Sequence, residues 1–315
     1  MAVCDLDIDP GVEVEICGVE AAANAASGDV CFVEGDANQA AKVNPAASAC
    51  FVKSGAATGL PDSVLPLIVD LPRFAHKRLS EALFELKDWL AEGPEPRIHP
   101  SAVIAPTAYI GTGAAIGEAA RIGPGAVIGP GVQIGARSSI GANATVRCAL
   151  IGNDVNIHAG AVIGEAGFGV TLGPGGAEDV PQWGRVILQD LVTVGANSCI
   201  DRGAFNDTIV GERTKIDNLV QIAHNVVIGR NVMMASFTGI SGTTNVGDDV
   251  VMGGRVGIAD HVTIGAGTRL AASSGVFRDI PPGETWGGVP AKPLKQYLRE
   301  IAWIQKQIAP KKKPK

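Results

Sequence analysis

Aromatic side chains, long apolar runs and paired cysteine motifs are scarce in this chain of 315 residues. Aromatics make up only 4% of it, which excludes a core built around large rings and favours thin aliphatic layers. No stretch approaches the roughly 18 apolar residues of a membrane-spanning helix. Residues 1–10 also lack the apolar segment of a secretory signal. We therefore expect a cytoplasmic protein without an integral membrane segment.

Metal and nucleic-acid sites are equally poorly supported. The six cysteines form no CxxC pair, which indicates reduced thiols rather than a zinc site or a disulfide framework. Zinc-binding β-helix hydratases use two histidines five positions apart, and this chain has no HxxxxH. The net charge of −6 gives no basic footprint for nucleic acid. We expect no metal, no cofactor and no nucleic-acid partner.

Aliphatic residues recur every six positions, without a slip from Val210 to Val276 and again from Ile98 to Ile140. This period fits neither an amphipathic helix nor an alternating strand, and it is the hexapeptide signature of a parallel β-helix. Three hexapeptides make one triangular coil, so residue i+18 stacks on residue i about 4.8 Å away. The rhythm loses one residue within 146–151 and breaks at Phe168–Arg185, an excursion that we interpret as a binding loop or a tolerated surface loop.

Three domains follow from the pattern: an N-terminal α/β domain over 1–95, the β-helix over 96–280, and a C-terminal helix with a basic tail over 281–315. The first domain has strand-like runs and one helical stretch, Pro72–Leu90. Its strand-like runs are Val12–Cys17, Val30–Val33, Ala49–Val52 and Leu67–Val69. The last helix, Ala291–Ile308, carries an apolar stripe that must pack on other copies or cap the open coil.

Two histidines of the repeats fall on one side of the solenoid. Gly242 stacks one coil above His224, and Asp260 stacks two coils above it, next to His261. The two histidines are therefore separated by about 10 Å, a gap that suits a ligand between them. A solenoid histidine can equally be a surface residue at a corner, which is how we interpret His158.

The segment Ile216–Val226 reads IDNLVQIAHNV and strongly resembles the core motif of the UDP-3-O-acylglucosamine N-acyltransferases of lipid A biosynthesis. Three further stretches are similar to that family, and the similarity covers about 98–308. They are Gly167–Gly169, Ile200–Gly203 with Asp207–Thr208, and Trp286–Pro290. The resemblance implies a left-handed β-helix, a homotrimer with active sites between subunits, and a uridine-binding N-terminal domain.

The implied reaction moves a 3-hydroxyacyl chain from acyl carrier protein to the 2-amino group of UDP-3-O-acyl-glucosamine. An amine that attacks a thioester must lose a proton, and histidine titrates near neutral pH, so His224 is the predicted base. Asp217 is predicted to bond its other ring nitrogen. Gly242 matches the family's oxyanion donor. His261 matches a second family histidine that positions substrate.

The remaining predicted contacts concern the two substrates. Gln221 and Asn225 flank the base and are predicted to bind the sugar nucleotide, although both also fit solvated corners. The small residues of 271–275 leave volume for a long acyl chain. Basic side chains just beyond them suit the acidic acyl carrier protein, or are ordinary solvated charges. These are Arg278, Lys292 and Lys295.

Two alternatives remain from the sequence. One is the O-acyltransferase that acts on UDP-N-acetylglucosamine, which shares the β-helix but has a larger helical C-terminus and no separate N-terminal domain. The other is a non-catalytic binding solenoid, in which alanine at His224 would change nothing except stability.

Overall fold

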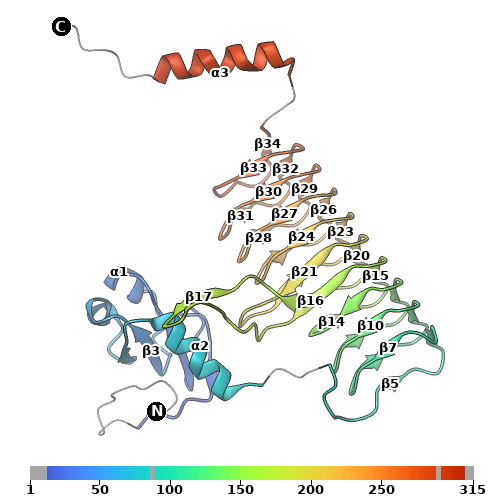
Figure 1. The fold of residues 1–315 in the computed structure, drawn as a ribbon, viewed down its shortest axis with the longest axis horizontal. Helices are drawn as coiled ribbons and strands as arrows, with labels where there is room; N and C mark the ends of the chain where they lie inside the picture. Colours follow the sequence, from blue (N-terminus) through green and yellow to red (C-terminus); the bar gives the residue numbers. More distant parts are fainter. Residues whose placement is uncertain (1–12, 86–88, 289–291, 309–315) are drawn as a thin grey trace.

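The computed structural model describes residues 13–85, 89–288 and 292–308 (Figure 1). It is mainly β: a small four-stranded parallel sheet at the N-terminus, a long solenoid, and one C-terminal helix. Figure 1 shows the coils stacked in one row, from β5 and β7 at one end to β34 at the other, with the N-terminal sheet to one side of them. Among the described helices none is long and apolar enough to cross a membrane.

The N-terminal unit packs one helix on its sheet. The sheet order is β1–β2–β3–β4 (Gly18–Val19, Asp29–Phe32, Ala49–Val52 and Leu65–Ile68). The short helices are α1 (Ala37–Ala40) and the 3₁₀ turn Ser54–Gly59, and the long one is α2 (Pro72–Leu83). Three of the four expected strands are confirmed. The expected strand at 12–17 is wrong in its described part, because pairing with β2 begins only at Gly18.

The solenoid has three faces, as the hexapeptide period predicts, and all their strand pairs are parallel. The first face holds β5 (Arg97–Ile98), β8 (Ala115–Ile116), β11 (Gln133–Ile134), β14 (Ala149–Ile151), β19 (Val186–Leu188), β22 (Thr208–Val210), β25 (Val227–Ile228), β28 (Asn245–Val246) and β31 (Thr263–Ile264). The second holds β7 (Tyr109–Ile110), β10 (Val127–Ile128), β13 (Thr145–Val146), β16 (Val162–Ala166), β21 (Cys199–Arg202), β24 (Gln221–Ile222), β27 (Gly239–Ile240), β30 (Gly257–Ile258) and β33 (Gly275–Val276). The third holds β6 (Val103–Ile104), β9 (Arg121–Ile122), β12 (Ser139–Ile140), β15 (Asn156–Ile157), β20 (Thr193–Val194), β23 (Lys215–Ile216), β26 (Met233–Met234), β29 (Val251–Met252), β32 (Arg269–Leu270) and β34 (Thr285–Trp286).

The aliphatic residue of each hexapeptide points inward and stacks on its equivalents in neighbouring coils. Ile222, Ile240 and Ile258 are in register and no more than 2% exposed. Burial of these thin layers removes apolar surface from water, which stabilises the folded state by about 25 cal/mol for each Å² buried. This core explains why a chain so poor in aromatics folds, and it confirms the predicted parallel β-helix.

The register departs from 18 residues at the last coil, where Arg269 pairs with Thr285, and in three earlier places. Gln133 pairs with Leu150, a coil one residue short, as predicted. Ala149 pairs with Val186, because the predicted excursion leaves the solenoid here and forms the hairpin β17–β18 (Val170–Gly173 and Gly176–Asp179). Cys199 pairs with Gln221, 22 positions on, because the turn at 203–206 adds four residues that the sequence analysis did not identify.

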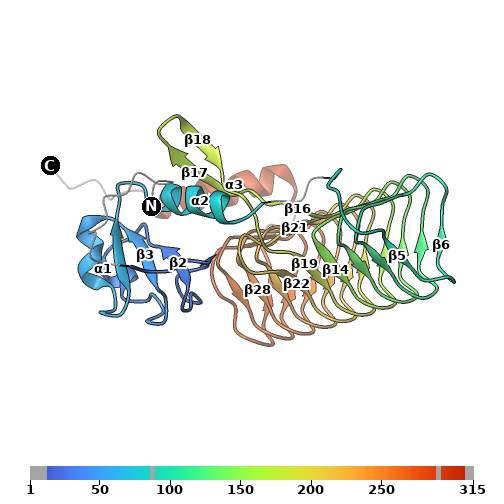
Figure 2. The same cartoon turned by 90° about the horizontal axis from the view of Figure 1, so that it is seen from below.

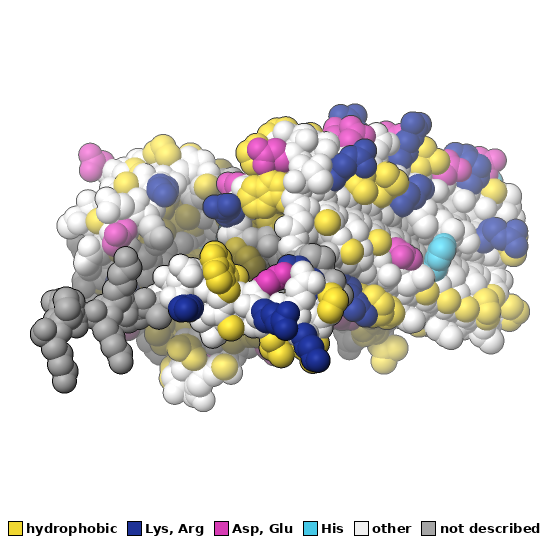
Figure 3. All heavy atoms as spheres, turned by 90° about the horizontal axis from the view of Figure 1, so that it is seen from above, with side chains coloured by type: hydrophobic (Ala, Val, Ile, Leu, Met, Phe, Trp, Pro, Cys, Tyr) yellow, Lys and Arg dark blue, Asp and Glu magenta, His cyan; other side chains and the backbone are white. Residues whose placement is uncertain are grey.

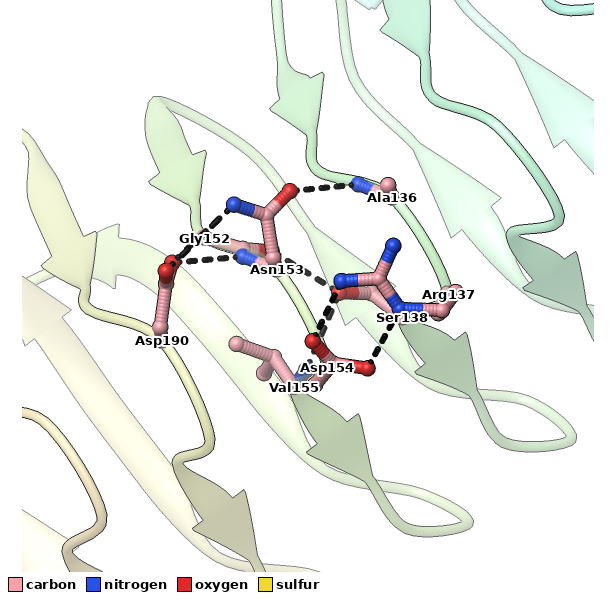
Figure 4. A network of polar contacts seen from close by, with 8 residues as sticks. All are labelled: Ala136, Arg137, Ser138, Gly152, Asn153, Asp154, Val155 and Asp190. Atoms are coloured by element: carbon pink, nitrogen blue, oxygen red, sulfur yellow. Dashed lines mark hydrogen bonds and ion pairs between the residues drawn. The ribbon is translucent and has the colours of Figure 1, made fainter.

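Side chains bridge the corner next to the short coil (Figure 4). Asn153 accepts a hydrogen bond from Ala136 N at 2.9 Å through its Oδ1, and its own N–H donates to Asp190 at 2.7 Å. Arg137 and Asp154 form a two-pronged ion pair beside it, with N–O distances of 2.8 and 2.7 Å. These contacts join three successive coils where the repeat is irregular.

The excursion fastens the N-terminal unit to the solenoid. Figures 1 and 2 both place the hairpin beside α2. Lys77 on α2 is 7% exposed and donates to Glu178 of β18 at 2.8 Å. Helix α2 ends at Leu83, and not at Leu90 as predicted, because Phe84 turns into extended backbone and packs on Trp183 with ring centroids 5.5 Å apart.

The C-terminal helix α3 spans Leu294–Ile308 and buries no residue. The predicted start at Ala291 lies outside the described residues, as does the lysine tail. Figure 1 shows α3 standing clear of the last coils, so it does not cap the solenoid by packing on it.

Candidate active site

His224 follows strand β24 at a corner of the solenoid and is half-buried. Its ring is held between two glycines. A Cβ on Gly242 would lie 2.7 Å from Cε1 of His224, and a Cβ on Gly167 would lie 2.8 Å from the Cβ of His224. The His224 side chain can therefore lie this close to both positions only because each is a glycine.

The side chain of Asn225 sets the orientation of this ring. Its Oδ1 lies 3.0 Å from Nδ1 of His224. The turn at 203–206 fixes the amide, because Ala204 N donates to Oδ1 at 3.0 Å and Nδ2 donates to Asn206 O at 3.1 Å. With an acceptor facing it, Nδ1 of His224 carries the proton, and Nε2 keeps its lone pair.

Asp217 does not take the place that the sequence predicted for it. Its carboxylate accepts from its neighbour Asn218 N at 2.8 Å and from Ser236 N at 3.1 Å. Seven residues carry Asp217 back to the preceding corner, so both of its oxygens serve the main chain there. Within one chain the partner of the His224 ring is therefore Asn225, which corrects the predicted pair.

Gly242 and His261 lie on the next two coils above His224, as the 18-residue stacking predicts. Thr243 N donates to the His224 carbonyl at 3.0 Å, and His261 N donates to the Gly242 carbonyl at 3.1 Å. No hydrogen bond within the described ranges uses the Gly242 N–H as its donor. Asn225, Thr243 and His261 all have φ near +60°, a backbone conformation that recurs at corners along the solenoid, for example at Asn143 and Asp249.

Asp201 adds a carboxylate that the sequence analysis did not place at the site. It accepts from Nε2 of Gln221 at 2.9 Å, so the amide nitrogen of Gln221 is already engaged. Burial raises the pKa of Asp201, while the Gln221 bond and the charge of His224 oppose that rise. The four inserted residues hid this contact, because 18-residue stacking would not bring Asp201 next to Gln221.

The predicted basic residues lie away from His224, at the end of the solenoid. The Arg278 guanidinium lies 5.2 Å from the ring centre of Trp286. Lys292 forms an ion pair with Glu300, and Lys295 is exposed on the first turn of α3. Across 13–85, 89–288 and 292–308, no group of three or more His, Cys, Asp or Glu side chains could hold a metal ion.

The fold and its repeats define a class: a left-handed parallel β-helix of hexapeptide repeats. The family model "Bacterial transferase hexapeptide (six repeats)" matches residues 113–148 and 207–242. A solved UDP-N-acetylglucosamine acyltransferase from Bacteroides fragilis covers 67% of this chain and 78% of its own, with 25% identity and a TM-score of 0.51. A Francisella novicida enzyme of the same name covers 66% and 72%, with 24% identity and a TM-score of 0.50, and shows the fold alone.

Curated relatives narrow the class. A UDP-3-O-acylglucosamine N-acyltransferase from Caulobacter sp. is 54% identical over 165 residues, which is 52% of this chain and 48% of the relative. One from Caulobacter vibrioides is 63% identical over 164 residues, with the same coverage. The chain thus spans about half the length of the curated relatives it matches. Over that half it is homologous to the UDP-3-O-acylglucosamine N-acyltransferase family, and the predicted resemblance is confirmed.

Proposed function

We propose that this protein transfers a 3-hydroxyacyl chain from acyl carrier protein to the 2-amino group of UDP-3-O-acyl-glucosamine, in lipid A biosynthesis. The observation that carries the proposal is the His224 ring, held by Asn225 through Nδ1 and flanked by Gly242 at Nε2. With Nδ1 bonded to Asn225, the ring can accept a proton at Nε2. The identities of 54% and 63% with curated N-acyltransferases favour the amine as acceptor.

The reaction follows from this geometry. The substrate amine attacks the thioester carbonyl and forms the C–N bond, while Nε2 of His224 takes the proton that the amine loses. The C–S bond then breaks, and the imidazolium returns the proton to the departing thiolate. Asn225 keeps Nδ1 protonated throughout, because its Oδ1 can only accept.

Charge on the tetrahedral intermediate needs a donor beside the base. The Gly242 N–H is the candidate, since its residue contacts the His224 ring and this N–H has no partner among the described hydrogen bonds. Loss of one such donor typically costs about 10²–10³ in rate. His261 lies one coil further along the same corner, and we assign to it the positioning of the substrate.

Gln221 and Asn225 have different parts in the proposed site. Asn225 orients the base, because both ends of its amide are bonded to the turn at 203–206. Gln221 is exposed and bonded to Asp201, so this pair can present its remaining oxygens to the sugar nucleotide.

Helix α3 supports two further parts of the proposal. Its apolar side chains are exposed, and a homotrimer would bury them. They are Leu294, Leu298, Ile304 and Ile308. Figure 3 shows basic side chains on the same helix, and with Arg278 the predicted pair Lys292 and Lys295 would attract an acidic acyl carrier protein. The reaction would take place in the cytoplasm and need no cofactor beyond the donor's own phosphopantetheine.

A mass-spectrometric assay tests the proposal against its rivals. The purified chain receives 3-hydroxyacyl carrier protein with UDP-3-O-acyl-glucosamine or UDP-N-acetylglucosamine, and His224→Ala serves as control. One acyl group on the first acceptor alone, lost in the variant, is the expected result. Acylation of the second acceptor would assign the O-acyl step instead. No product on either acceptor from an intact oligomer would favour a binding solenoid.

A further inference from the structure

An open cavity of about 530 Å³ lies where the N-terminal unit, the excursion and the first face of the solenoid meet. Its walls include Phe84 from the end of α2, Trp183 from the excursion and Leu150 from β14. This volume falls within the range of about 300–1,000 Å³ that small-molecule sites occupy, and such sites favour domain junctions. The proposed acyl transfer uses none of these residues.

One buried cation lines this cavity. Arg202 is 6% exposed, and its guanidinium donates to the carbonyls of Gly184 and Trp183 at 2.7 and 3.0 Å and to Sγ of Cys148 at 2.9 Å. These three bonds leave two of its five N–H groups for another partner. No ion pair within the described ranges involves Arg202, and burial lowers the pKa of its guanidinium.

Among the described residues, no carboxylate forms an ion pair with Arg202. Glu165 acts on its charge from nearby but is itself paired with Arg147 at 3.1 Å. Arg185 is paired with Asp207, which accepts from it at 2.9 and 3.2 Å. Glu85 is exposed. A buried guanidinium without an ion-pair partner is costly, so an anion that bonds it directly recovers electrostatic stabilisation.

We propose that this cavity is a binding site for a small monocarboxylate with an apolar body, whose carboxylate bonds Arg202 and whose body lies against Phe84, Trp183 and Leu150. The carboxylate matches the planar donor geometry of a guanidinium. The site is separate from His224 and does not depend on the proposed acyl transfer. Because both the N-terminal unit and the solenoid line the cavity, a bound ligand strengthens their junction.

Calorimetric titration of the full chain with octanoate tests the site, with 1-octanol as the uncharged probe of the same length. We expect octanoate to saturate at one site per chain. The affinity for 1-octanol should be lower by about tenfold or more, because the hydrogen bond between the carboxylate and the Arg202 guanidinium is lost. Arg202→Lys should reduce this preference, since a lysine cannot reproduce the planar pair of donors.

Two tryptophan substitutions locate the binding without disturbing buried residues. Gln133 is exposed on β11 and lines the cavity, so Gln133→Trp should fill it and abolish octanoate binding. Thr263→Trp, on β31 of the same face, is the matched control and should bind like the parent chain. Equal affinity for octanoate and 1-octanol, or octanoate binding that survives Gln133→Trp, would overturn the proposal. Melting temperatures of all variants establish that they are folded.

Discussion

Lowering the pH should weaken the N-terminal unit through one histidine, His76 on α2. It is 1% exposed, its Nε2–H donates to the Val30 carbonyl at 3.2 Å, and its ring centroid is 5.0 Å from those of Phe32 and Phe205. Burial in this apolar setting lowers the pKa of His76 from 6.5 to about 4. The folded state therefore keeps His76 neutral at pH values where the unfolded chain is already protonated.

The sign and size follow from that shift. Above pH 6.5 the His76 ring is neutral in both the folded and the unfolded chain, and its contribution to the free energy of unfolding is complete. As the pH falls from 6.5 towards 4 the unfolded chain binds the proton first, so stability is lost. At about 1.4 kcal/mol per pH unit, the full loss is about 3 kcal/mol, of which about 2 kcal/mol is gone at pH 5.

Urea unfolding at pH 7.5 and pH 5.0, followed by circular dichroism, measures this loss. His76→Gln keeps an N–H donor for Val30 but cannot titrate, so the difference between parent and variant isolates the histidine from the carboxylates. His99→Gln is the matched control, because His99 is exposed. If the parent and His76→Gln lose the same free energy on acidification, the reasoning from burial is refuted.

Three further substitutions test the site and the fold. Asn225→Ala should lower kcat by about 10²-fold or more by freeing the His224 tautomer, while Asn225→Asp keeps an acceptor and should retain more activity in steady-state assays. Gly242→Ala should displace the His224 ring, which a Cβ would approach to 2.7 Å, and should reduce kcat without lowering the melting temperature comparably. Arg137→Ala should leave the melting temperature nearly unchanged, since its ion pair with Asp154 is exposed; a large drop would show that the bridged corner carries more stability than its exposure implies.

The regular part of the fold was predictable because one residue type repeats at one interval. The period of six implied three faces, inward aliphatic columns and 18-residue stacking, and the registers of Gln221, Gly239 and Gly257 confirm that stacking. The same arithmetic placed Gly242 above His224. Local spacing was sufficient for these features because each coil contacts mainly its own neighbours.

Tertiary contacts decided what the sequence missed. Helical spacing continues past Leu83, but packing of Phe84 on Trp183 ends α2 there, and the partner is 99 positions away in the chain. Asp217 was the expected partner of His224 because it is an acid at a neighbouring corner. The turn at 203–206 instead orients Asn225 towards the ring, and nothing in the hexapeptide spacing signals that turn.

Regular stacking brings Gly242 and His261 onto the column of His224, and three departures from the 18-residue register add contacts to the proposed sites. The short coil contains Cys148 and so contributes the thiol beside Arg202, and Gly167, immediately before the excursion, lies against His224. The four-residue turn orients Asn225. Both proposed sites therefore depend on irregular segments fixed on a rigid solenoid, which is where loops on a repeat scaffold generally carry function.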